Sequence, residues 1–288
     1  TGNLFKNKVL AATSVINGFG KSTGLVQIDE LGNIETPIIM TNTFGVGTAL
    51  NAVTKYMMKE NEDIGTTTGT VNCVVTECND GELNDIRGMH VTEEDVLQAI
   101  ENCGDVFEEG VAGSGSGMIC MGIKGGIGSA SRIVPCDGKD YTIGAILMSN
   151  FGMSGNLMID GRRIDTEKVP KSKAEKGSVI IIIGTDLPLN ERQLRRVAKR
   201  ATVALCRTGS FLGNGSGDIA VAFSNTNIMP HYSEKNIIET KMFHDDAIDK
   251  IFEATAEVVE EAVVSSIYHA ENVKGIRGKE VFALKEFL

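Results

Sequence analysis

Residues 166–184 read TEKVPKSKAEKGSVIIIIG, and the change of character within this stretch organises the whole chain. Segment 166–176 is polar and Lys-rich, contains a Pro and lacks apolar periodicity, which predicts a linker between two well-patterned halves. Residues 179–183 form the longest aliphatic run of the chain. This run predicts a buried strand and is far too short to span a bilayer.

Strand-like runs are frequent on both sides of this junction. They cover residues 24–28, 37–41, 71–76, 118–123, 129–134, 142–149, 156–159, 179–184 and 218–223. Because strands outnumber helices and arrive in runs, the pattern favours an α+β fold over a regular doubly wound one. In such a fold, sheet packs against sheet and helices lie outside.

Helices are expected to be fewer but longer. Thr92 and Asp95 have capping-box spacing, and Gly104 is a candidate C-cap for the helix that follows. Asn190 is expected to cap a second helix, and helical spacing of apolar residues predicts a third over about 245–270. A fourth is expected after Thr48.

The composition excludes several classes of protein. The chain has 288 residues, 42% hydrophobic and 23% charged, which is typical of an ordinary globular protein. A formal charge of −10 argues against generic binding to nucleic acids or anionic membranes. No charged-then-apolar signal segment opens the chain.

The cysteines and histidines predict neither disulfides nor a metal site. Six cysteines occur, none in a CxxC pair, and no histidine stands at zinc-motif spacing from them. We therefore interpret the cysteines as the reduced thiols of a cytoplasmic protein and expect no metal site.

Three Gly-containing stretches resemble ligand-binding loops. Gly20-Lys-Ser-Thr23 resembles the end of a P-loop, but Val15 stands where that motif needs Gly, and the following residues predict a strand where it needs a helix. Stretches 113–118 and 124–131 are either tight turns around a strand or a pocket lined by backbone N–H groups. The sequence favours neither alternative.

The Gly177–Ser178 junction suits self-cleavage. The Ser178 hydroxyl could attack the Gly177 carbonyl, and water would hydrolyse the resulting ester. Ser178 would then carry a free α-amine of pKa about 7.7–8.0, able to act as base for its own hydroxyl. On the junction alone, the favoured alternative is that Ser178 simply starts a core strand.

A second cluster supports the catalytic hypothesis. Ser216 and Asp218 alternate with Gly ahead of an apolar run, so both side chains face one side of an extended segment. Enzymes activate a nucleophilic Ser by placing a hydroxyl or other base next to it and a carboxylate next to that group, so that the Ser proton can be passed on. Asn150, at the end of the 142–149 run, offers an amide donor for an oxyanion.

The Gly177–Ser178 junction occurs together with further characteristic stretches, namely residues 41–47 (TNTFGVG), 77–86 (ECNDGELNDI), 113–118, 124–128, 149–152 and 207–218. In this combination the chain resembles the DmpA-like peptidases. That family comprises the L-aminopeptidase D-Ala-esterase/amidases and the β-peptidyl aminopeptidases. The resemblance implies a four-layer αββα sandwich, one domain over 1–288, and self-cleavage into chains 1–177 and 178–288. It implies Ser178 as nucleophile, Ser216 and Asp218 as its partners, and Asn150 in the oxyanion hole.

The resemblance also implies a carboxylate for the free amino group of the substrate, here Glu77. From the Gly-rich stretches we further expect Gly115, Gly117 and Asn214 to contact substrate. The implied substrates are small peptides, amides or esters, cleaved without a cofactor by a homo-oligomer, a tetramer in this family. Two alternatives stay open: an acyltransferase of the ornithine acetyltransferase type, against which Ser rather than Thr at 178 argues, and a cleavage-dead binding protein.

Overall fold

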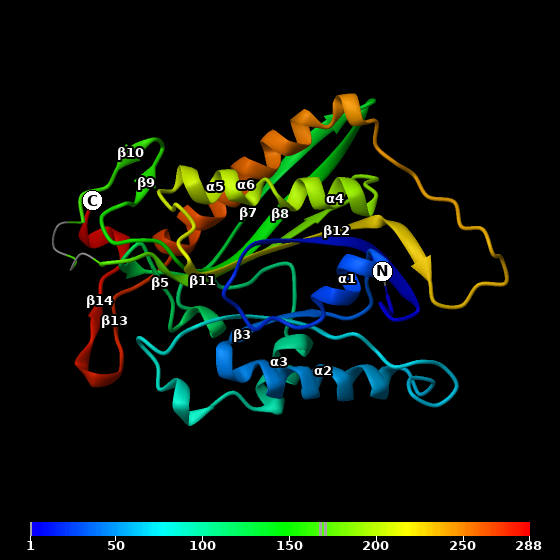
Figure 1. Ribbon diagram of the computed structural model, residues 1–288, viewed down its shortest axis with the longest axis horizontal. Helices are drawn as coiled ribbons and strands as arrows, with labels where there is room; N and C mark the ends of the chain where they lie inside the picture. The colour runs from blue at the N-terminus through cyan, green and yellow to red at the C-terminus, as the bar shows by residue number, and fades with distance from the viewer. Residues whose placement is uncertain (1, 167–168, 170–171) are drawn as a thin grey trace.

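The computed structural model describes residues 2–166, 169 and 172–288 and is built around one six-stranded sheet (Figure 1). The strand order is β2 (Asn33–Ile34), β1 (Asn7–Gly18), β12 (Gly215–Pro230), β11 (Lys176–Thr185), β8 (Lys139–Asn150) and β7 (Gly126–Cys136). β11 pairs in parallel with β12 and antiparallel with β8. The aliphatic run of the sequence thus lies in the middle of the sheet.

Three further layers complete the fold (Figure 1). Helices α4 (Glu191–Ala198), α5 (Ala201–Arg207) and α6 (Asp249–Tyr268) cover one face of the large sheet. On the other face lies a parallel pair, β3 (Ile38–Asn42) and β4 (Val74–Cys78), followed by α2 (Val46–Glu60) and α3 (Glu93–Glu101). The order is helices, sheet, sheet, helices, which confirms the α+β class and the αββα sandwich.

Burial on both faces explains why residues 179–183 are all aliphatic. Val179, Ile181 and Ile183 belong to the core cluster shared with α4, α5 and α6, whereas Ile180 and Ile182 belong to the cluster shared with β4. Successive side chains of a strand point to opposite faces, so a strand between two packed layers needs apolar residues at every position. A third cluster fills the space between β4 and helices α2 and α3.

The remaining elements are short. They are α1 (Leu25–Leu31), β5 (Ile119–Cys120), β6 (Ile123–Lys124), β9 (Met158–Ile159), β10 (Arg162–Arg163), β13 (Val273–Lys274) and β14 (Glu280–Val281). β5 with β6, β9 with β10, and β13 with β14 each form a two-stranded antiparallel pair.

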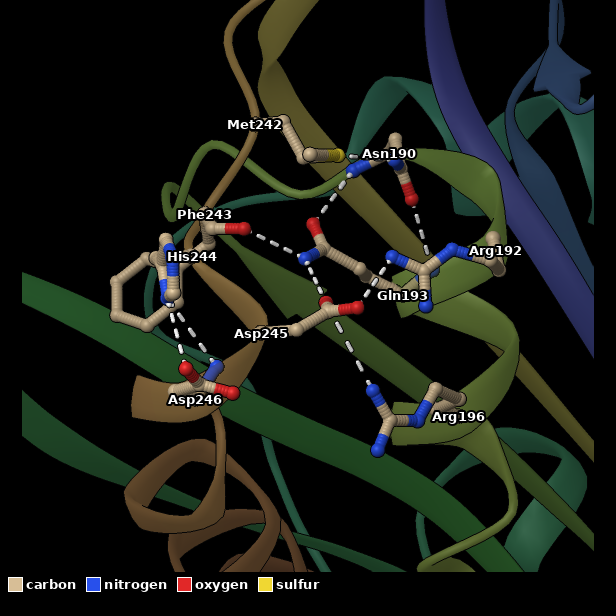
Figure 2. A network of polar contacts seen from close by, with 9 residues as sticks. All are labelled: Asn190, Arg192, Gln193, Arg196, Met242, Phe243, His244, Asp245 and Asp246. Carbon is tan, nitrogen blue, oxygen red and sulfur yellow. Dashed lines mark hydrogen bonds and ion pairs between the residues drawn. The ribbon is translucent and has the colours of Figure 1, made fainter.

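A polar network fastens the segment that leads into α6 to helix α4 (Figure 2). The buried Gln193 side chain donates from Nε2 to the Phe243 carbonyl and to Asp245 Oδ1, each at 2.7 Å. Arg192 reaches Asp245 Oδ2 at 2.7 Å, and Arg196 lies 3.7 Å from Oδ1. The Gln193 hydrogen bond, followed by those of Arg192, lowers the pKa of Asp245. These contacts fix where α6 begins and hence how it lies on the sheet.

Most predicted strands occur, with three differences. Residues 24–28 form the start of α1 rather than a strand, and β1 was not predicted. Residues 118–123 divide into two short strands, separated by Met121 and Gly122 at positive φ. A P-loop is followed by a helix, and α1 does follow Thr23. The strand predicted there was therefore wrong and does not argue against a P-loop at residues 20–23. Val15 in place of the required Gly still argues against one.

The helix signals at Thr92 and Asn190 are confirmed. Both residues form capping boxes, with Asp95 and Gln193 respectively. α3 ends at Glu101 with Asn102 as its C-cap, so the assignment of Gly104 was wrong. The helix after Asn190 is interrupted between α4 and α5, and the helix expected over 245–270 spans Asp249–Tyr268 after a 3-10 turn.

The predicted linker over 166–176 lies partly outside the described residues, which omit 167–168 and 170–171. Its end is not solvent-exposed linker: Glu175 is buried and Lys176 already belongs to β11. Strands from before and after this segment share the large sheet. Within the described part of the chain, no helix has the length and apolar character needed to cross a membrane.

Candidate active site

Ser178 lies near the start of β11, at the wall of a pocket of about 740 Å³. Its side chain is 3% exposed, and its Oγ accepts a hydrogen bond from the Asn79 backbone N–H at 3.2 Å. The wall also includes Phe19, Lys21, Thr43, Glu77, Asn79, Glu82, Ile119, Asn150, Gly177, Lys279 and Phe282. The hydroxyl is therefore held by one backbone donor at the edge of a space that a small molecule can fill.

Gly177 has a backbone conformation that favours glycine. Its φ is +125°, and a Cβ built on it would lie 1.9 Å from the carbonyl oxygen of Asn150. Only a residue without a side chain can adopt this conformation at this distance from β8. The peptide bond that precedes Ser178 is consequently held close to the end of β8.

Ser216 and Asp218 form a buried pair on β12, next to the junction. Ser216 Oγ donates to Asp218 Oδ1 at 2.6 Å, and neither side chain is exposed to solvent. The parallel register places Ser216 opposite Gly177 and Asp218 opposite Val179. Asp218 Oδ2 has no hydrogen-bond partner among the described residues. Burial, opposed by the Ser216 hydrogen bond, raises the pKa of Asp218 to about 6.

Asn150 lies directly opposite Ser178 in the antiparallel pair of β8 and β11. Its Oδ1 accepts from the Ile119 backbone N–H at 2.9 Å, and its Nδ2 donates to the Asn79 carbonyl at 2.9 Å. The side-chain amide is thus fixed at both ends. One Nδ2 hydrogen holds the Asn79 peptide, and the residue lines the pocket.

Glu77, near the end of β4, contributes a buried carboxylate to the pocket. Its Oε1 accepts from the Lys21 backbone N–H at 2.9 Å, and its Oε2 accepts from the Thr43 hydroxyl. These donors are neutral, and Glu77 forms no ion pair with another described residue. The carboxylate can therefore pair with a cationic group that enters the pocket.

Three expected substrate contacts lie elsewhere. Gly115, Gly117 and Asn214 are not among the residues that line the pocket. A Cβ at Gly115 would lie 2.4 Å from the Gly110 carbonyl oxygen, and one at Gly117 would lie 2.5 Å from Asp80 Cβ, so both positions permit close packing. Asn214 is exposed, and its carbonyl accepts from Asn17 Nδ2 at 3.3 Å.

Reasoning from the sequence missed Asn79, Lys21, Thr43 and Lys124. Asn79 and Lys21 act through backbone N–H groups, which residue type does not reveal. Lys124 is completely buried, and a lysine preceded by Cys120, Met121 and Ile123 was a visible signal. No cluster of three His, Cys, Asp or Glu side chains that could hold a metal ion occurs within 2–166, 169 and 172–288.

Several known proteins are similar to this chain. The model of peptidase family S58 matches residues 1–281. The β-peptidyl aminopeptidase BapA of Sphingosinicella microcystinivorans is 36% identical over 96% of this chain and 74% of its own length.

Two solved structures superpose closely. The PH0078 protein from Pyrococcus horikoshii OT3 has a TM-score of 0.93 and 52% identity, covering 98% of this chain and 79% of its own. The L-aminopeptidase D-Ala-esterase/amidase from Ochrobactrum anthropi, described as a prototype for the serine aminopeptidases and a variant of the Ntn hydrolase fold, has a TM-score of 0.88 and 35% identity. It covers 96% of this chain and 78% of its own. These relatives favour a hydrolase over an acyltransferase or a binding protein, and the chain belongs to peptidase family S58.

Proposed function

We propose that this protein is a self-processing serine aminopeptidase or amidase that releases N-terminal residues from small peptides, amides or esters through an acyl-enzyme on Ser178. The observation that carries the proposal is one pocket holding both the Ser178 hydroxyl and the Glu77 carboxylate. An aminopeptidase needs a nucleophile and an anion that holds the substrate's free ammonium group.

Self-cleavage would generate the active form. Ser178 Oγ attacks the Gly177 carbonyl carbon, the C–N bond breaks, and the nitrogen leaves as the α-amine of Ser178. Water then hydrolyses the ester, leaving chains 1–177 and 178–288. The backbone conformation of Gly177 and the absence of room for a Cβ there support this site of cleavage.

In the substrate reaction, the ammonium group pairs with Glu77 and Ser178 attacks the scissile carbonyl. The Ser178 proton passes either to its own α-amine or to the Ser216–Asp218 pair, and these two bases stay alternatives. Asp218 Oδ2 can accept a further hydrogen bond, which supports the second. Asn150, opposite Ser178 in the sheet, and the Asn79 N–H, which contacts Ser178 Oγ, are the proposed donors for the oxyanion. The bond from the carbonyl carbon to the amine or alcohol then breaks, this leaving group takes the proton from the base, and water hydrolyses the acyl-enzyme to free Ser178 and the N-terminal residue.

The setting of the enzyme is part of the proposal. All six cysteines are free, which supports a reducing, cytoplasmic compartment. The likeness to the DmpA-like peptidases supports a homo-oligomer, with a tetramer expected, and a small peptide or amide as substrate. Sedimentation of the purified protein checks the oligomeric state.

The decisive experiment compares the intact mass of the wild type and of Ser178→Ala under denaturing conditions. We expect two chains split after residue 177 in the wild type and a single inactive chain in the variant. Asn214→Ala, at an exposed position outside the pocket, is the matched control and should split normally. Full splitting and full amidase activity in Ser178→Ala would falsify the proposal.

A further inference from the structure

Lys124 is a charged group in the core that the proposed mechanism does not use. Its side chain has no solvent exposure, and its Nζ donates to the carbonyl oxygens of Gly115 at 2.9 Å, Met118 at 2.9 Å and Gly125 at 2.7 Å. An ammonium group has three donors, so all are used. Within the described residues it forms no ion pair with a carboxylate. A buried unpaired charge is costly, so this lysine needs a specific explanation.

The three carbonyls belong to the segment 115–125, which includes the β5–β6 pair, and one of them leads directly to Asn150. The Met118 carbonyl and the Ile119 N–H are the two ends of a single planar peptide group. Lys124 holds the carbonyl end, and Asn150 Oδ1 accepts from the N–H end at 2.9 Å. A cation on the carbonyl both fixes this peptide plane and strengthens its N–H as a donor.

The same chain of contacts continues to the nucleophile. The Ile119 N–H holds the oxygen end of the Asn150 amide, so the nitrogen end must point away from Ile119. There Nδ2 donates to the Asn79 carbonyl at 2.9 Å. The Asn79 N–H in turn donates to Ser178 Oγ at 3.2 Å. Lys124 is thus joined to Ser178 through the Met118–Ile119 peptide, the Asn150 side chain and Asn79.

The geometry points to Lys124, in its charged form, as a positioning residue that sets the orientation of the Asn150 amide and through it the place of Ser178. The inference rests on the proposed roles of Ser178 and Asn150. A neutral amine has two donors for three carbonyls, so loss of the proton leaves one carbonyl of segment 115–125 without its hydrogen bond to Lys124.

The surroundings of Lys124 make this loss accessible at moderate pH. Burial lowers the pKa of Lys124 to about 8. Besides the carbonyl groups, the titratable group that acts on it is Cys120 on β5, and burial raises the pKa of that thiol to about 12. Cys120 is therefore neutral when Lys124 titrates and does not hold its proton in place.

The kinetic test compares Lys124→Met with Lys285→Met, an exposed lysine outside the pocket. With an aminoacyl p-nitroanilide as substrate, we expect Lys124→Met to lose about 10- to 100-fold in kcat with KM changed less than about threefold. Lys124→Arg, which keeps its charge at all accessible pH values, should recover part of kcat and show no fall above about pH 8. Wild-type kcat in Lys124→Met would overturn the inference.

A second measurement needs neither turnover nor a folded Lys124→Met. In uncleaved Ser178→Ala protein, which has no free α-amine at residue 178, the Asn150 carboxamide carbon is followed by NMR against pH, assigned by its change in Asn150→Asp. We expect a transition with a midpoint near pH 8, the pKa of Lys124. A signal constant from about pH 6.5 to 9.5 would contradict the inference. This signal reports only the orientation of the Asn150 amide. It therefore tests the role of Lys124 even if Ser178→Ala proves active and the proposed function fails.

Discussion

The carbonyl oxygen of Asn150 occupies the place where a side chain at Gly177 would begin, 1.9 Å from a Cβ built there. This contact joins the residue before the proposed scissile bond to the residue proposed for the oxyanion hole. It also links the neighbouring strands β8 and β11 at the edge of the pocket.

Gly177→Ala is therefore expected to slow self-cleavage by at least about tenfold, since the added methyl group must move the scissile peptide or β8. Intact mass measured over time after purification gives the rate. Gly155→Ala is the matched control: φ is +83° there, but nothing lies within 4 Å of the added Cβ. That variant carries backbone strain alone and should split at the wild-type rate, so equal slowing in both would argue against a steric role.

Asp218→Asn should change the pH dependence of stability. The pKa of Asp218 in the folded protein, about 6, lies above its unfolded value of about 3.8. Between these values the folded state binds more protons than the unfolded state, so the contribution of Asp218 to stability is lost as pH rises through this window. The loss is on the order of 3 kcal/mol.

The measurement is Tm of wild type and Asp218→Asn between about pH 4.5 and 7.5. We expect the variant to gain Tm relative to the wild type as pH rises, while its amidase activity falls. If the difference in Tm between the wild type and Asp218→Asn stays constant across this pH range, the Asp218 carboxylate titrates at a lower pH than the range covers.

Glu77→Gln should remove the preference for substrates with a free amino group. Loss of a buried charge pair with the substrate ammonium costs about 2–5 kcal/mol, which corresponds to roughly 30- to 4000-fold in kcat/KM. We expect this loss for alanyl p-nitroanilide and a much smaller one for lactyl p-nitroanilide, which has a hydroxyl in place of the amine. Thr43→Val, which removes one neutral donor to the carboxylate, is the control and should keep the preference. Parallel losses for both substrates would assign Glu77 a purely structural role.

Gln193→Leu tests the network that fastens α6 to α4 (Figure 2). The substitution leaves the Phe243 carbonyl without the donor it has at 2.7 Å and should lower stability by about 1–3 kcal/mol. Urea unfolding measures this loss. Self-cleavage and kcat should stay close to wild type, because none of these residues lines the pocket. A large loss of activity in a fully folded variant would connect α4 with the site.

Local signals predicted the elements that local physics controls. The caps at Thr92 and Asn190 follow from short-range hydrogen bonding, and the aliphatic run of β11 follows from burial on both faces. β1 escaped prediction because its Ala, Thr and Ser residues give no alternating pattern. Residues 24–28 were predicted as a strand because Leu25, Val26 and Ile28 are apolar, although Val26 is exposed in the fold.

The sequence by itself determined the α+β class, the junction at Gly177–Ser178 and the residue types around it, since these depend on composition, periodicity and motif. Only the tertiary structure decided that Asn150 faces Ser178, that the Asn79 N–H reaches the hydroxyl, and that Lys124 holds the intervening loop. The physical reason is that strand register brings together residues distant in the chain. Backbone donors and carbonyls, which every residue carries, then make the decisive contacts.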